Sequence, residues 1–429
     1  MNSNAYLGLI VKNKKGKKHY MQKNKINKYL MVLFGFFIPI STAVTNILLG
    51  LILLFWILDN IKDRFKNIIL VLRSNPVALM GGVLFLIYLA GSLYSNAETE
   101  GIVESLRDGV KFAFIPMMMI YFKDEKIRPS FMAGFICAMV VVLFLSYLLW
   151  LEMLPGLFPV KGDLKNPTIF FLHITQNIFM AYMVFVFAVW ARFSSKLNER
   201  LIFFGVSLIA LFNVLFLIQG RTGHLIMIVL LVYFFFAWRS VKSIAIALSL
   251  IVLMVTGIWM YPSNPLVVRA TKVVNEVKAW DYEKPTQDTS SSGLRMEFYL
   301  NSLKLIKESP VFGTGTGSFA KTYHEAYKDT KMIQGVVHPH NDYLMFAVQF
   351  GVVGLLVLLG FFMAQWKYAG RLTERKETIL SRGFILTMLC ACMVSSPLID
   401  HAEGWFFAFM SAFFFANIPV LSRDSSRDD

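Results

Sequence analysis

Long apolar runs recur along almost the whole chain and are separated by short polar gaps. A run of about 20 apolar residues is long enough to cross the hydrocarbon core of a bilayer as a helix. The pattern predicts twelve spans, at about residues 28–41, 43–58, 76–94, 107–122, 130–151, 172–191, 200–218, 222–238, 243–261, 341–363, 379–396 and 404–421. The first two meet at Pro39 and Ser41, so one tilted helix is the alternative there. We therefore predict an all-α integral membrane protein with about twelve transmembrane helices.

Basic residues gather at one end of alternate spans. Eight lysines lie between Lys12 and Lys28, just before the first span, and smaller basic clusters fill several short gaps. Because short basic loops stay in the cytoplasm, both termini are expected to be cytoplasmic. The gap 95–106 then lies outside, and it is acidic, as expected. This topology accounts for the net charge of +15, so we expect no nucleic-acid partner.

One extracytoplasmic segment, residues 262–339, is much longer than the other outer gaps under this topology. Residues 265–280 and 294–309 have apolar positions at helical spacing, which predicts two amphipathic helices. Pro310 and a glycine-rich turn at 313–317 end the second helix. Two such helices near the membrane surface would cap a cavity between spans nine and ten. The predicted divisions are a cytoplasmic tail (1–27), spans one to nine (28–261), the helical loop (262–339), spans ten to twelve (340–421) and a second cytoplasmic tail (422–429).

Composition supports the membrane assignment and excludes several kinds of chemistry. The chain is 56% hydrophobic with a mean hydropathy of +0.58, above the range of ordinary soluble domains. All three cysteines fall in apolar runs, so neither a disulfide framework nor a zinc site is predicted. Carboxylates at ligand spacing are not evident in the spans, which argues against a metal site and against ion-coupled transport. The glycine-rich sequence at 313–318 lacks the lysine of a phosphate-binding loop. We expect no cofactor.

Charged residues at the edge of a bilayer are few here and therefore informative. Arg221 lies in QGRTGHL, an outward-facing turn between two spans. It either contacts lipid headgroups or grips an anionic ligand, since arginine binds phosphate through two parallel hydrogen bonds. Arg295 is predicted at the start of the second loop helix, where free backbone N–H groups favour an anion. It could also be a solvated surface residue, and Arg269 is a weaker candidate of the same type.

His340 begins the tenth span in the sequence HPHNDYLMFAVQFGVVGLL. Imidazole titrates near neutral pH, so a histidine at this edge suits general-base work on a hydroxyl, although a structural role is the alternative. Asn341 is a suitable helix cap, while Asp342 could orient the imidazole or stabilise the helix N-terminus. Gly351 and Gly354 would let another helix approach closely.

Together these features resemble the O-antigen ligase and polymerase superfamily of membrane glycosyltransferases. Its members carry His-Asn, His-Ser or His-Gln, then nine residues and Gly-x-x-Gly, after a large periplasmic loop. His340-Asn341 is followed here by nine residues and Gly351-Val-Val-Gly354. SSGLRMEFYLNSLKLIKESPVFGTGTGSF is similar to the loop helix and glycine turn of the family, and QGRTGHL to its first arginine motif. The resemblance is strongest over about 200–360.

The resemblance implies a metal-independent, inverting enzyme of the bacterial inner membrane, with its active site on the periplasmic side. A ligase would transfer a glycan from undecaprenyl diphosphate to the lipid A-core oligosaccharide, its lipid partners in the membrane. Arg221 and Arg295 would stabilise the diphosphate leaving group. His340 would accept or position the proton of the acceptor hydroxyl. Asn341, Asp342, Gly351 and Gly354 would support the site.

Alternatives remain open within and beyond this family. An O-antigen polymerase or a protein O-oligosaccharyltransferase would differ in the acceptor. Leu355 follows the second glycine, where ligases often have Thr, Tyr or Gly, whereas the single long outer loop favours a ligase. A flippase or another transporter of lipid-linked glycans is the more distant alternative. Sequence gives neither the glycan, the acceptor sugar nor the oligomeric state.

Overall fold

The structure is a computed structural model that describes residues 14–58, 61–154, 156, 159–238, 265–281, 291–330 and 335–418. Every regular element in these residues is a helix, and β pairing is limited to an isolated bridge between Asp163 and Asn166. The elements are α2 (Lys14–Phe37), α3 (Thr42–Leu58), α4 (Ile61–Ser74), α5 (Pro76–Ser92), α6 (Thr99–Phe122), α7 (Arg128–Trp150), α8 (His173–Phe193), α9 (Leu197–Phe212), the π-helix η1 (Asn213–Leu217), α10 (Arg221–Ala237), α12 (Pro265–Ala279), α13 (Ser291–Glu308), α14 (Phe319–Tyr327), α15 (Asp342–Ala369), α16 (Arg375–Val394) and α17 (His401–Phe415). The all-α prediction is confirmed.

Several helices have the length and composition of membrane spans. Within the described residues, five are long and apolar enough to cross a bilayer: Arg128–Trp150, His173–Phe193, Leu197–Leu217, Asp342–Ala369 and Arg375–Val394. Two shorter apolar helices, α5 and α10, accompany them. The chain is therefore a multi-pass membrane protein, while the count of twelve spans stays a prediction. The predicted span 243–261 lies outside the described residues.

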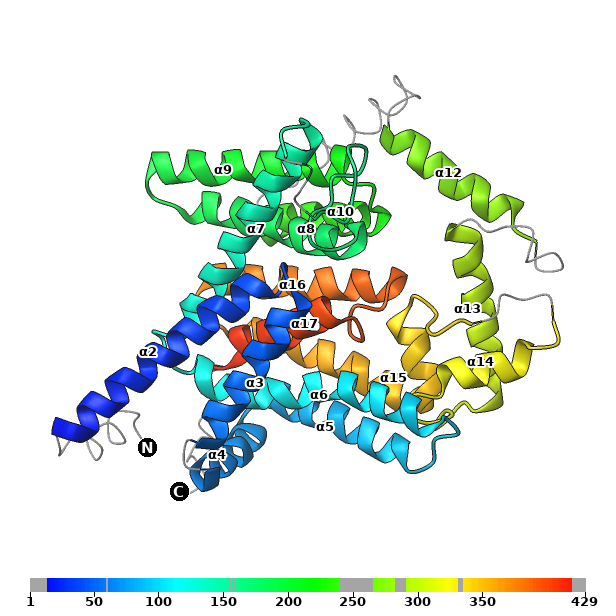
Figure 1. Cartoon of the computed structure of the whole chain (residues 1–429), viewed down its shortest axis with the longest axis horizontal. Helices are drawn as coiled ribbons and strands as arrows, with labels where there is room; N and C mark the ends of the chain where they lie inside the picture. The colour runs from blue at the N-terminus through cyan, green and yellow to red at the C-terminus, as the bar shows by residue number, and fades with distance from the viewer. Residues whose placement is uncertain are drawn as a thin grey trace, which may run out of the picture.

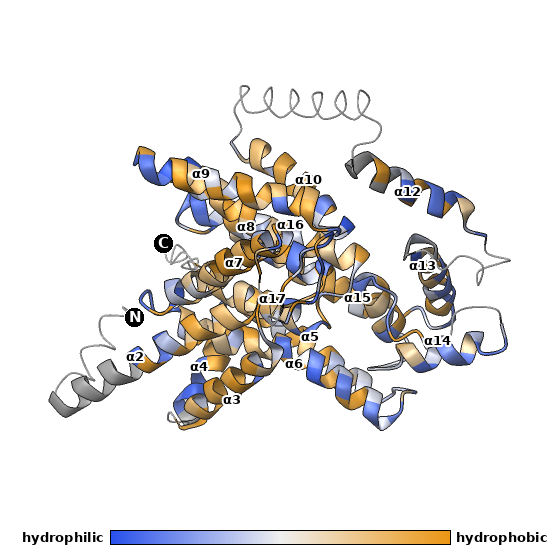
Figure 2. Cartoon of the chain, turned by 45° about the horizontal axis from the view of Figure 1, so that its top comes forward, coloured by the Kyte–Doolittle hydropathy of each residue, from blue (hydrophilic) through white to orange (hydrophobic). Residues whose placement is uncertain are grey.

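The core of the helical bundle is built largely from phenylalanine. The ring of Phe384 on α16 packs against Phe406 and Phe407 on α17, at centroid distances of 5.8 and 5.9 Å. Phe112 on α6 and Phe361 on α15 also contact Phe407. Figure 2 shows the contrast in polarity, because the bundle helices are mainly hydrophobic whereas α12, α13 and α14 carry many hydrophilic residues. The apolar bundle is the part of the fold suited to lipid.

The long loop forms an arc of helices beside one end of the bundle (Figure 1). Sequence predicted two helices in it, and the structure adds a third, α14. This helix buries Phe319, Tyr323 and Tyr327, four residues apart, against Phe298 of α13 and Met345 of α15. It was missed because it has only nine residues. The loop is thus anchored to the bundle through α13 and α14.

Helix α15 is broken at Gly351, whose φ of 62° and ψ of −161° are non-helical. After the break, the amides of Val352 and Val353 donate to the carbonyls of Pro310 and Val311, respectively. Before it, the carbonyl of Val348 accepts from the amide of Thr314 at 3.0 Å. A Cβ on Gly351 would lie 2.2 Å from the Val311 oxygen. The expectation of a close helix–helix approach is therefore wrong for Gly351, because the partner is the turn that follows α13.

Gly354 does not admit a neighbouring helix either. A Cβ there would lie 2.2 Å from the Cβ of Phe350, on the other side of the same break. The kink moves the Phe350 side chain over Gly354, which explains the absence of a side chain at that position. Both glycines therefore determine the shape of α15, more than two turns beyond its start at Asp342.

Candidate active site

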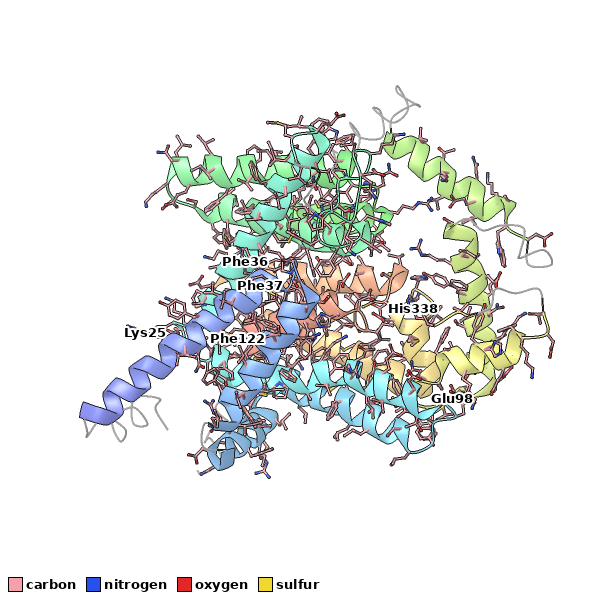
Figure 3. The ribbon with its side chains drawn as sticks, viewed as in Figure 1. Lys25, Phe36, Phe37, Glu98, Phe122 and His338 are labelled. Atoms are coloured by element: carbon pink, nitrogen blue, oxygen red, sulfur yellow. The ribbon has the colours of Figure 1, made fainter. Side chains whose placement is uncertain are left out.

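Three predicted residues come together where the bundle meets the helical loop. Arg221 is the first residue of α10, Arg295 lies in α13, and His340 precedes α15. Helix α13 connects them, because its Ser292 accepts from Arg221 at 2.6 Å and its Tyr299 donates to the backbone carbonyl of His340 at 3.3 Å. Neighbouring His338, labelled in Figure 3, lies on the side of the bundle that faces α13. Residues separated by up to 119 positions thus share one site.

The guanidinium of Arg221 makes a two-pronged contact with a carboxylate of the loop. Its Nη1 and Nη2 donate to the two carboxylate oxygens of Glu276 on α12, at 3.0 and 3.2 Å, and Nη1 also donates to the Ser292 hydroxyl at 2.6 Å. These hydrogen bonds from Arg221 are the main reason that the pKa of Glu276 falls to about 2. Arg221 therefore has the fork geometry expected for binding an anion, and the anion is a protein carboxylate.

Arg295 does not lie at the start of its helix, where the sequence predicted it. Helix α13 begins at Ser291, so Arg295 lies in its second turn and not at the free N-terminal amides. Burial lowers the pKa of its guanidinium, and Tyr299, Arg221 and Glu276 also act on it. The sequence predicted that this helix begins at residue 294, whereas in the structure residues 291–293 are already helical. Arg295 nevertheless reaches the same site as Arg221.

His340 adopts a left-handed backbone conformation, with a φ of 53°. Its ring lies 4.3 Å from that of His338 and 6.2 Å from that of Phe298, nearly parallel to the latter. Burial, followed by the charges of His338 and Arg295, lowers the pKa of His340 to about 4. Tyr299 donates from its hydroxyl to the backbone carbonyl of His340 at 3.3 Å. The imidazole is therefore neutral at pH 7, as a general base must be.

The two residues after His340 fix the start of α15. Asn341 is its N-cap, because its side-chain oxygen accepts from the amide of Leu344 at 3.1 Å, and its Nδ2 donates to the Met393 carbonyl at 3.0 Å. The cap prediction is confirmed. The carboxylate of Asp342 is fully buried and accepts from the amide of Leu398 at 3.0 Å, so its contact is with the connection between α16 and α17, and both options for its role stay predictions. Asn341 thus binds the end of α16 and Asp342 binds the connection between α16 and α17, which together fix the start of α15 beside His340.

Comparison with known proteins identifies the central part of the chain. Residues 204–359 match the family model described as O-antigen ligase. This segment belongs to the O-antigen ligase family. It contains Arg221, Arg295 and His340, so the residues that meet in the structure all lie within the family domain. The match supports a membrane glycosyltransferase of the O-antigen ligase or polymerase type in general terms.

The chain is also similar to a curated protein of Haemophilus influenzae that is described as an uncharacterized protein. The two are 24% identical over 196 residues, which is 44% of this chain. The chain spans about half the length of this relative, with 49% covered. The similarity to this protein therefore adds no information about substrates.

Sequence reasoning missed a buried polar cluster formed by residues outside the matched segment. Lys111 on α6 is 4% exposed, and its ammonium donates to Asp108 at 2.9 Å and to the carbonyls of Ile399 and Asp400 at 2.7 and 3.0 Å. Glu403 on α17 is also buried. The expectation that carboxylates are missing from the bundle interior is therefore wrong. The charges are visible in the sequence, but they are near the ends of the predicted spans 107–122 and 404–421, where local pattern alone does not show that they are buried.

Proposed function

We propose that the protein is an O-antigen ligase that transfers a glycan from undecaprenyl diphosphate to the lipid A-core oligosaccharide. The observation that supports this most is the meeting of Arg221, Arg295 and His340 inside the segment that matches the ligase family. Two cations and a neutral imidazole at one site provide what the reaction needs. The cations stabilise a lipid diphosphate as it leaves, and the imidazole accepts a proton.

In the proposed reaction, an acceptor hydroxyl oxygen attacks the anomeric carbon of the donor sugar. A new glycosidic bond forms as the bond from that carbon to the diphosphate oxygen breaks, with inversion. The hydroxyl proton moves to the imidazole of His340, which is neutral because burial lowers its pKa to about 4. The negative charge that develops on the diphosphate is stabilised by Arg221 and Arg295, and no metal ion is required.

The membrane arrangement follows from the same proposal. Twelve spans would cross the bacterial inner membrane with both termini in the cytoplasm, so that α12, α13 and α14 lie in the periplasm. Both substrates are lipids and would enter the site laterally from the outer leaflet. The many hydrophilic residues of α12, α13 and α14 in Figure 2 fit a position outside the hydrocarbon core.

A gene deletion with lipopolysaccharide analysis on a gel tests the function. Loss of a ligase leaves bare core and carrier-linked polymer, and plasmid-borne wild-type protein should restore the polymer-bearing bands. Core carrying a single repeat would show a polymerase instead. Unchanged lipopolysaccharide together with loss of glycan from a secreted protein would show a protein O-oligosaccharyltransferase.

The His340→Ala variant separates an enzyme from a flippase. We expect this variant to accumulate at the wild-type level but to fail to restore polymer-bearing lipopolysaccharide, with the carrier-linked glycan on the periplasmic face. Cytoplasm-facing carrier-linked glycan in the same variant would contradict an enzyme and favour a flippase. Full complementation by His340→Ala would remove His340 from the mechanism.

A further inference from the structure

Arg221 lies in an anion site that the chain occupies with its own carboxylate. Two nitrogens of its guanidinium bind both oxygens of Glu276, and one of them also binds the Ser292 hydroxyl. Glu276 is well covered in this position, with its side chain 10% exposed, and Lys272 approaches it at 3.9 Å. The carboxylate is therefore held by a set of donors and positive charge, and not by a single surface contact.

The same donors suit a phosphoryl group. The planar fork of arginine binds carboxylate and phosphate oxygens with similar geometry. Ser292 is the second residue of α13, so the site adjoins the N-terminal amides of a helix, which favour anions. Arg295, one turn further along α13, interacts electrostatically with both Arg221 and Glu276. A diphosphate brings more negative charge to this site than the carboxylate does.

Helix α12, which carries Glu276, is lightly packed. It contacts α13 and η1, while Val268 and Val274 are 54% and 49% exposed. Apolar side chains that stay this exposed hold a helix in place only weakly, so we expect movement of α12 to cost little. The Arg221–Glu276 pair joins α12 to the first residue of α10, and hence to the bundle. Loss of this pair would free α12 without disturbing the core.

Building on the role of Arg221 in the proposed reaction, we propose that Glu276 competes with the diphosphate of the donor for Arg221. Binding of the diphosphate displaces the carboxylate and releases α12 from α10. The helix then acts as a gate whose position depends on whether Arg221 holds the protein's carboxylate or the donor's diphosphate. Glu276 is in this view a gating residue and takes no part in bond making.

The test uses the full chain in nanodiscs with farnesyl diphosphate, a short lipid diphosphate, as the probe. Titration calorimetry measures its affinity for the wild type and for Glu276→Gln, which keeps the side-chain shape but removes the charge. A partly exposed ion pair that must be broken weakens a competing ligand by about 2- to 5-fold, so Glu276→Gln should bind that much more tightly. Hydrogen exchange of residues 265–279 should rise when the probe binds to the wild type. In Glu276→Gln it should be high already without the probe.

Glu325→Gln is the matched control. Glu325 on α14 also pairs with a lysine four residues away, Lys321 at 3.8 Å, but it is remote from Arg221. Its removal should change neither the affinity for the probe nor exchange in α12. If Glu276→Gln is not monodisperse, Glu276→Asp provides the comparison. Its shorter carboxylate reaches Arg221 less well, so it should bind the probe more tightly than wild type by a smaller factor.

Equal or weaker binding by Glu276→Gln would overturn the proposal, because the carboxylate would then be a structural tie alone. Unchanged or reduced exchange in α12 on probe binding would overturn it as well, and so would the absence of probe binding to both proteins. These readouts do not depend on glycan transfer. If Glu276→Gln binds the probe more tightly and α12 is released, but deletion of the gene leaves lipopolysaccharide unchanged, the gate is supported and only the proposed reaction is rejected.

Discussion

Replacement of Gly351 by alanine should destabilise the fold more than any other glycine substitution in α15. The backbone there has a φ of 62° and a ψ of −161°, a region essentially restricted to glycine. Holding alanine in that region costs about 1–3 kcal/mol. The new Cβ would also lie 2.2 Å from the Val311 oxygen, so the turn after α13 must move away.

That movement has a further energetic cost. The Pro310 and Val311 carbonyls accept from the amides of Val352 and Val353, at 2.8 and 3.3 Å, across the gap that must open. Each such bond contributes about 1 kcal/mol to stability. With the backbone strain, the expected loss for Gly351→Ala is about 3–5 kcal/mol.

The assay is unfolding of the purified protein by SDS in mixed micelles, followed by tryptophan fluorescence. Gly360→Ala in the same helix is the control, because a Cβ there meets only the mobile end of Met80, at 3.2 Å. Alanine is favoured over glycine in a helix by about 0.5–1 kcal/mol, so this control should be unchanged or slightly more stable. If Gly351→Ala and Gly360→Ala unfold within about 1 kcal/mol of each other, the break in α15 does not require glycine.

Four further predictions concern the site and the Lys111 cluster. Arg221→Lys should lose glycan transfer in the complementation assay despite its retained charge, because a lysine cannot bind two oxygens in a fork; wild-type levels of transfer would refute that reasoning. The acid limb of kcat/KM for transfer should fall near pH 4, following the lowered pKa of His340, and a limb near pH 6.5 would contradict a buried neutral imidazole. The pKa of His340 is lower in the folded than in the unfolded protein, so the free energy of unfolding should decrease as the pH falls from about 6.5 toward 4. SDS unfolding at several pH values can detect this decrease. Lys111→Met should lower stability by about 1–3 kcal/mol in the same assay, since it leaves the Asp108 carboxylate and the carbonyls of Ile399 and Asp400 without their donor, and wild-type stability would show that the cluster is not needed for folding.

The sequence by itself determined the features that depend on local periodicity and residue type. Apolar runs predicted the helices and the membrane class, and Asn341 was correctly identified as the cap of α15. The few charged and histidine residues at the ends of apolar runs also included Arg221, Arg295 and His340, although their roles stay predictions. Such features could be predicted because helix formation and capping depend on neighbours within a few positions.

Tertiary structure decided the partners that the chain brings in from far away. Glu276 meets Arg221 across 55 positions, and Lys111 reaches the carbonyl of Ile399 across 288. Gly351 was assigned to the wrong neighbour because the break in α15 exists only where the turn after α13 supplies its hydrogen bonds. No local pattern encodes such pairs, since each is selected by the packing of whole helices and by the need to satisfy polar groups buried there.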